Sequence, residues 1–152
     1  MDNMPSRQFQ LTRKEDEEPN KVAGIILKII QIICGFICLG LLRYYHLLFP
    51  YESRLYLAII TTGGFILISG VLLLGSFMKQ GNPPTQEALI NLLGAAMYIA
   101  TGATTVDLYL RYDIHSESTR VGFVFGGLAI VTGFLYIADT FLAVRRQRDD
   151  EL

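Results

Sequence analysis

The chain has few residues of the kinds that carry catalysis or bind metals. Of its 152 residues, two are histidines, two are cysteines and none is tryptophan. His46 and His115 each lack a second ligand at metal-binding spacing. No serine or cysteine nucleophile has a base nearby, and there is no glycine-rich phosphate loop. The sequence therefore predicts no catalytic, metal or cofactor site, and it favours a protein that is not an enzyme.

The positions of the two cysteines argue against a disulfide bond in the loops. Cys34 and Cys38 lie one helical turn apart inside an apolar segment, where neither reaches a loop. We therefore expect no extracellular disulfide. The net charge of −1 gives no indication of a nucleic-acid partner.

Long apolar blocks dominate what is present, since 51% of the residues are hydrophobic. A helix needs roughly 20 apolar residues to cross the hydrocarbon core of a bilayer. Four blocks reach that length and are apolar nearly all round, unlike the helices of a soluble bundle. The sequence predicts an all-α fold, a four-helix transmembrane bundle in a lipid bilayer, with helices at about Val22–Leu42, Leu55–Phe77, Ala88–Leu110 and Val121–Val144.

The flanking segments are short and polar. Residues 1–21 carry mixed charges, which are typical of a disordered tail. Residues 22–144 form the membrane domain, whose first block we expect to act as an uncleaved anchor, and residues 145–152 form a short tail. Counting basic residues beside the spans, eight lie on the side of the two termini and four on the other. This bias predicts that both termini are cytoplasmic.

Two charged residues interrupt the apolar blocks at matching depth. Lys28 in the first span and Asp139 in the fourth each lie roughly 8–9 Å inside the same membrane boundary, at 1.5 Å per helical residue. Either charge alone would be costly in lipid, so we predict an interhelical pair between them. The alternative is that Lys28 extends its amino group to the headgroups. Asp107, near the other boundary, has Arg111 one turn later, which predicts only a local i,i+4 pair.

Small residues recur at spacings that allow helices to pack closely in a membrane. In the third span Ala96, Ala100 and Thr104 follow one another at intervals of four residues. We expect the small residues of the third and fourth spans to serve packing within the bundle, with assembly with other membrane proteins as the alternative. The set is Gly94, Ala96, Ala100, Thr104, Gly126, Gly127 and Gly133.

The last residues, RDDEL, resemble an endoplasmic-reticulum retrieval signal. Such a signal is read in the lumen, whereas the basic residues predict a cytoplasmic tail. An acidic residue two positions before a terminal apolar one, here Asp150 and Leu152, is instead typical of a peptide that adds a strand to a PDZ-type groove.

Transport is the main alternative to a structural role. Lys28 and Asp139 are residue types that carriers use inside the membrane. Carriers usually show broken helices or inverted repeats, whereas these spans have no interior proline and no internal repeat. A transporter or channel would therefore have to be a small oligomeric one.

Three spans resemble those of a known family. The stretches INLLGAAMYIATGA in span three, RVGFVFGGLAIVTGFLYIADTFLAV in span four and ILKIIQIICGFICLGLLRYY in span one look like the insect snakeskin family of small four-span proteins. Span two is similar only in character. The topology is broadly similar to that of MARVEL-type proteins. The absence of tryptophan and of paired loop cysteines excludes a claudin, and the lack of a large cysteine-rich loop excludes a tetraspanin.

The resemblance implies a multi-pass plasma-membrane protein of smooth septate junctions, located at cell–cell contacts of epithelia. There the family helps to form the paracellular barrier with a mesh-like single-span protein and a tetraspanin-like protein. It implies no catalysis, no cofactor, no nucleic acid and no small-molecule substrate. The connection Arg43–Arg54 is shorter than in the family's junctional members and lacks their glycine-rich character, as a divergent relative with another membrane role would.

Overall fold

The computed structural model describes the chain except for residues 1–4, 45–51, 79–80, 112–116 and 152. The described residues form four helices and contain no strand: α1 (Pro5–Tyr44), α2 (Glu52–Phe77), α3 (Pro84–Arg111) and α4 (Glu117–Glu151). Each helix contains a stretch long and apolar enough to cross a membrane: Pro19–Arg43, Ser53–Phe77, Pro84–Arg111 and Thr119–Asp149. The all-helical, four-span fold predicted from the sequence is confirmed.

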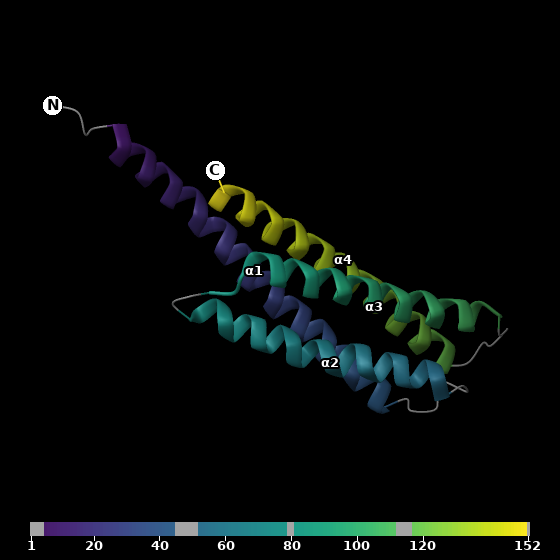
Figure 1. Cartoon of the computed structure of the whole chain (residues 1–152). Helices are drawn as coiled ribbons and strands as arrows, with labels where there is room; N and C mark the ends of the chain where they lie inside the picture. Colours follow the sequence, from purple (N-terminus) through teal and green to yellow (C-terminus); the bar gives the residue numbers. More distant parts are fainter. Residues whose placement is uncertain (1–4, 45–51, 79–80, 112–116, 152) are drawn as a thin grey trace.

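The first and last helices, α1 and α4, extend beyond the apolar blocks (Figure 1). α1 begins at Pro5, so residues 5–21 of the segment predicted to be a disordered tail lie in a helix. The glutamines, lysines, arginines and glutamates of this segment have high helix propensity. The prediction of disorder rested on mixed charge alone and did not take that propensity into account. α4 continues past Val144 to Glu151, and Gln147 donates a hydrogen bond of 3.2 Å to Glu151 one turn later. The predicted short tail is therefore mostly a continuation of the last helix.

The helices form a ring in which each packs against two neighbours, with α3 and α4 in the most extensive contact. The start of α1 and the end of α4 lie at the same end of the bundle, together with the connection between α2 and α3 (Figure 1). We call this end the tail face. At the opposite face α1 and α3 end, and α2 and α4 begin.

The connection at the tail face follows turn chemistry that the sequence contains. Gly81 has a φ of 63°, which suits glycine because other L-residues rarely adopt it. The side chain of Asn82 donates a hydrogen bond of 2.7 Å to the carbonyl of Leu72, which holds the connection against the last turns of α2. Pro84 begins α3 at a position where a missing backbone N–H has no cost.

Glycines bring α3 and α4 close together. A Cβ atom on Gly102 would lie 2.7 Å from the carbonyl oxygen of Gly126, and one on Gly133 would lie 3.2 Å from that of Ala95. These distances leave no room for larger residues, because the neighbouring atoms belong to backbone. Gly94 is also buried, against the rings of Phe65 and Tyr136.

Four of the seven small residues predicted to pack within the bundle face outward instead. Gly94, Gly126 and Gly133 are buried, whereas Ala96, Ala100, Thr104 and Gly127 are exposed. The prediction rested on a four-residue spacing along α3. That spacing places residues on one face of the helix, but it does not indicate whether the face is turned to the bundle interior or to lipid. The face of α3 turned to α4 carries Ala95 and Gly102.

The interior contains two apolar clusters. One lies toward the opposite face and comprises Cys38, Leu42, Ala58, Leu108, Tyr109 and Phe125. The other lies at mid-depth and comprises Phe65, Ala95, Tyr98, Ala129 and Tyr136. In it, the ring centroids of Phe65, Tyr98 and Tyr136 are 5.4–6.0 Å apart. Large apolar side chains such as Leu67, Val71 and Phe141 are exposed on the outside of the bundle, where lipid tails would cover them.

Candidate functional site

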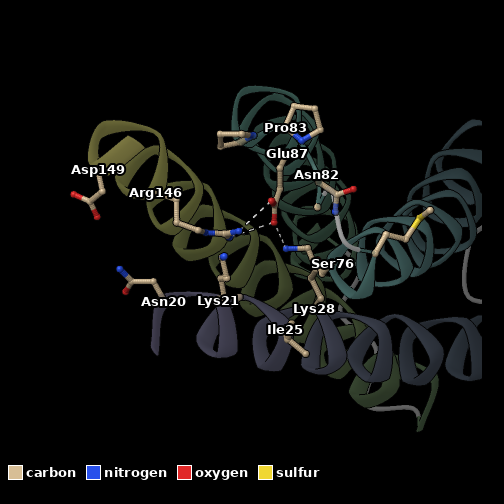
Figure 2. A pocket seen from close by; sticks show the side chains of 14 residues that line it. Asn20, Lys21, Ile25, Lys28, Ser76, Asn82, Pro83, Glu87, Arg146 and Asp149 are labelled. Atoms are coloured by element: carbon tan, nitrogen blue, oxygen red, sulfur yellow. Dashed lines mark hydrogen bonds and ion pairs between the residues drawn. The ribbon is translucent and has the colours of Figure 1, made fainter. Parts of the chain in front are cut away.

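Four charged side chains from three helices meet inside the tail half of the bundle. The amino group of Lys28 on α1 contacts a carboxylate oxygen of Glu87 on α3 and lies 2.9 Å from Oδ2 of Asp139 on α4. Arg146, two turns after Asp139, places its two terminal nitrogens 3.4 Å from the Glu87 oxygens. Glu87 thus lies between Lys28 and Arg146 (Figure 2). We call these four residues the charge network.

Burial of the network is nearly complete. Lys28 and Glu87 are 1% exposed, Asp139 is 0% exposed and Arg146 is 21% exposed. Two positive and two negative side chains give a formal charge of zero. Isolated charges in a membrane interior are expensive, but a paired and neutral set has a much smaller cost.

Local sequence explains how the four groups reach one another. Lys28 follows Gly24 by one turn, and a Cβ atom on Gly24 would lie 2.9 Å from a guanidinium nitrogen of Arg146. The glycine therefore leaves the space that this guanidinium occupies between α1 and α4. Glu87 lies in the first turn of α3, where the helix dipole favours a negative charge.

The structure brings together the two residues predicted to pair, and it adds two that the sequence did not single out. Glu87 lies one residue before the predicted third span, and Arg146 lies in the predicted C-terminal tail. The available signal was helical spacing. Glu87 is one turn before Asn91, and Arg146 is seven residues, about two turns, after Asp139. Continuing each helix outward would have placed both charges on the inward face.

A cleft of about 660 Å³ opens on the charge network at the tail face (Figure 2). Its walls come from residues 20–28 in the middle of α1, the end of α2, the α2–α3 connection, the start of α3 and the end of α4. Lys28, Glu87 and Arg146 line it, together with Lys21 and Asn82. The network is thus buried in the bundle yet borders a space at the tail end.

The other predicted features, a local charged pair and a C-terminal peptide ligand, lie outside the charge network. Arg111 donates a hydrogen bond of 3.0 Å to Asp107, and both side chains are exposed near the opposite face. Asp150 lies in α4, while Leu152, the other half of the predicted PDZ-type ligand, lies outside the described residues. Within the described ranges no group of three or more histidine, cysteine or acidic side chains is arranged to hold a metal ion.

The geometry of the network is that of an internal brace. Each carboxylate contacts a cation, and the contacts join α1 to α3, α1 to α4 and α3 to α4. Such an arrangement fixes which helices are neighbours. It also places titratable groups beside a cleft, which is the arrangement that proton and ion pathways use.

The chain is an integral membrane protein by the length and apolarity of its four helices, and a lipid bilayer is its environment. Comparison with models of protein families, with curated proteins and with solved structures gives no match.

Proposed function

We propose that this chain is a non-enzymatic membrane protein that works by assembling with other membrane proteins. The observation that carries the proposal is the outward position of Ala96, Ala100 and Thr104 on α3. Small residues at this spacing allow the backbone of another helix to approach closely in lipid. The bundle does not bury these side chains, and α3 packs on α4 through a different face.

The charge network supports a structural role. The α1–α3 contact spans the diagonal of the ring, and the two α4 contacts join neighbours in it. A bundle held in one arrangement presents a constant outer surface, which an assembly partner requires. All four charged groups already have partners of opposite sign, so none is left as an isolated reactive charge.

The cellular role we propose is the organisation of an epithelial junction at the plasma membrane, with both termini in the cytoplasm. This part rests on the resemblance of spans one, three and four to the snakeskin family. In this role the partners would be a mesh-like protein and a tetraspanin-like protein. The site of action would be a smooth septate junction and its paracellular barrier.

The experiment is rescue of a depleted epithelium. We expect the tagged chain to concentrate at cell–cell contacts and its depletion to raise paracellular leakage of a small tracer. Ala100→Leu should leave the bundle folded but fail to restore the barrier. Ala138→Leu, an exposed position on α4, is the matched control and should restore it. Uniform distribution over the membrane, or equal rescue by both variants, would refute the proposal.

A second candidate is a small oligomeric transporter or channel. The observation in its favour is that the cleft reaches Lys28 and Glu87 inside the bundle. Purified protein in liposomes should then conduct an ion or a proton flux that Asp139→Asn abolishes. Absence of flux from well-folded wild-type protein would leave assembly as the function.

A further inference from the structure

Buried polar side chains continue inward from the charge network toward the middle of the membrane. Gln31 lies one turn after Lys28 on α1, and Asn91 lies one turn after Glu87 on α3. Both are at most 1% exposed. Tyr98 follows two turns after Asn91, and its hydroxyl oxygen is 3.3 Å from the Cβ position of Gly35 on α1. The three side chains thus extend the polar interior from the cleft to the mid-depth aromatic cluster.

Most of the hydrogen-bonding atoms in this region lack a protein partner. Gln31 donates one hydrogen bond of 3.4 Å to the carbonyl of Leu135. Its Oε1, both amide atoms of Asn91, Oδ1 of Asp139 and the hydroxyl of Tyr98 have none among the described residues. The amide of Asn91 is therefore fully buried with no hydrogen bond at all. These five unpartnered atoms come from α1, α3 and α4.

Dry burial of these atoms would be costly. Each unsatisfied buried donor or acceptor has given up its hydrogen bonds to water without replacing them, so five such atoms together would strongly oppose folding. Polar groups in protein interiors are satisfied by water where other protein atoms do not reach them, and one buried water makes about three hydrogen bonds. The donors and acceptors present here, amide, carboxylate and phenol, are all suited to water.

The polar region is closed on its far side. The rings of Phe65, Tyr98 and Tyr136 pack against one another at mid-depth, and the Tyr136 hydroxyl is already bonded to Ser69 at 2.6 Å. Beyond them, Thr61 and Thr101 satisfy one another across α2 and α3 at 3.0 Å. The apolar cluster around Phe125 then fills the bundle toward the opposite face. Within the described residues, unpartnered polar atoms are found only on the tail side of this aromatic layer or in it.

We propose that the bundle contains a water-filled half-channel that opens at the tail-face cleft, passes the Lys28 network and ends at Tyr98. The half-channel would admit water and the protons that water carries. The charge network forms the mouth, Gln31 and Asn91 line the middle, and the aromatic layer is the closed end. Water and protons reach the membrane midplane from one side without crossing it. The inference concerns this chain's interior and is independent of the assembly role proposed above.

The test is the reactivity of introduced cysteines toward a small, water-soluble methanethiosulfonate. The full-length chain with Cys34→Ala and Cys38→Ala is placed in lipid nanodiscs, and Asn91→Cys is compared with Leu92→Cys. Leu92 is the next residue along α3 and therefore at nearly the same depth, but it is 56% exposed on the outer surface. The thiolate is the reactive form, and desolvation raises a thiol pKa by several units, each unit lowering the thiolate fraction tenfold. We expect Asn91→Cys to react roughly 100-fold faster than Leu92→Cys.

Two further positions make the outcome decisive. Gln31→Cys should also react rapidly, and it replaces Asn91→Cys if that variant does not fold as judged by gel filtration. Thr105→Cys, buried beyond the aromatic layer, should react as slowly as Leu92→Cys. If Gln31→Cys and Asn91→Cys are as slow as Leu92→Cys, the interior is dry and the proposal is wrong. If Thr105→Cys reacts as fast as Asn91→Cys, water also reaches the interior beyond Tyr98, and a half-channel closed at the aromatic layer is refuted.

Discussion

Substitution of Lys28 should destabilise the bundle more than substitution of Asp139. In Lys28→Leu, Asp139 loses its hydrogen-bond donor, because Oδ2 accepts from Lys28 and Oδ1 accepts from none of the described residues. The network then holds two carboxylates and one guanidinium. Stranding one member of a buried pair costs about 3–5 kcal/mol. In Asp139→Ala, Lys28 keeps Glu87, so we expect a smaller loss of about 1.5–3 kcal/mol, the usual contribution of a hydrogen bond to a charged group.

The double variant Lys28→Leu/Asp139→Ala tests whether the two residues interact or contribute to stability independently. In Lys28→Leu/Asp139→Ala both stranded charges are gone, and Glu87 and Arg146 remain as a neutral pair. Replacing both members of a buried pair can be nearly neutral, so the double variant should lose less than Lys28→Leu alone. The measurement is the free energy of unfolding in detergent for the four proteins of the cycle. Membrane contacts sometimes contribute nearer 1 kcal/mol, which would shrink every value but keep their order.

Additive losses would refute the reasoning, because residues that do not interact show no coupling. Arg111→Leu is the control for loss of a basic residue as such. Its partner Asp107 is half-exposed near the opposite face, and exposed pairs contribute about 0–1 kcal/mol. A loss from Arg111→Leu as large as that from Lys28→Leu would show that the assay does not report on the network.

Three further predictions concern packing, an internal hydrogen bond and topology. Gly102→Leu should prevent folding or lower thermal stability strongly, because its Cβ meets the Gly126 backbone, whereas Gly127→Leu on open surface should have little effect in the same melting assay. Ser69→Ala should destabilise by about 1–3 kcal/mol in detergent unfolding, because it removes the hydrogen bond to the buried Tyr136 hydroxyl, and Ser69→Ala/Tyr136→Phe should recover part of that loss. Tags at either terminus should be labelled only after cells are permeabilised, since basic residues favour the cytoplasmic side; labelling of the C-terminus on intact cells would reverse the orientation.

The sequence was sufficient for the fold because length and apolarity alone determine that a segment crosses a bilayer. It was also sufficient to relate Lys28 to Asp139, since depth along each helix follows from counting residues. It was insufficient for Glu87, because the limit of an apolar block is not the limit of a helix, and the first turn of α3 lies outside the block. Nor could it orient Ala96 and Ala100, because rotation of a helix about its axis is set by neighbours that a single apolar segment does not identify.

The long chain separation between Lys28 and its partners has a consequence for synthesis in the cell. Glu87 follows Lys28 by 59 residues and Asp139 follows it by 111. At about 5–20 residues per second, α1 is made roughly 5–20 s before the last carboxylate that it contacts. During that interval the lysine is close enough to the tail face for its long side chain to reach the headgroups. Glu87 and then Asp139 draw it into the bundle, so that a nascent chain stopped before Glu87 would hold a first helix whose lysine has neither of its two carboxylate partners.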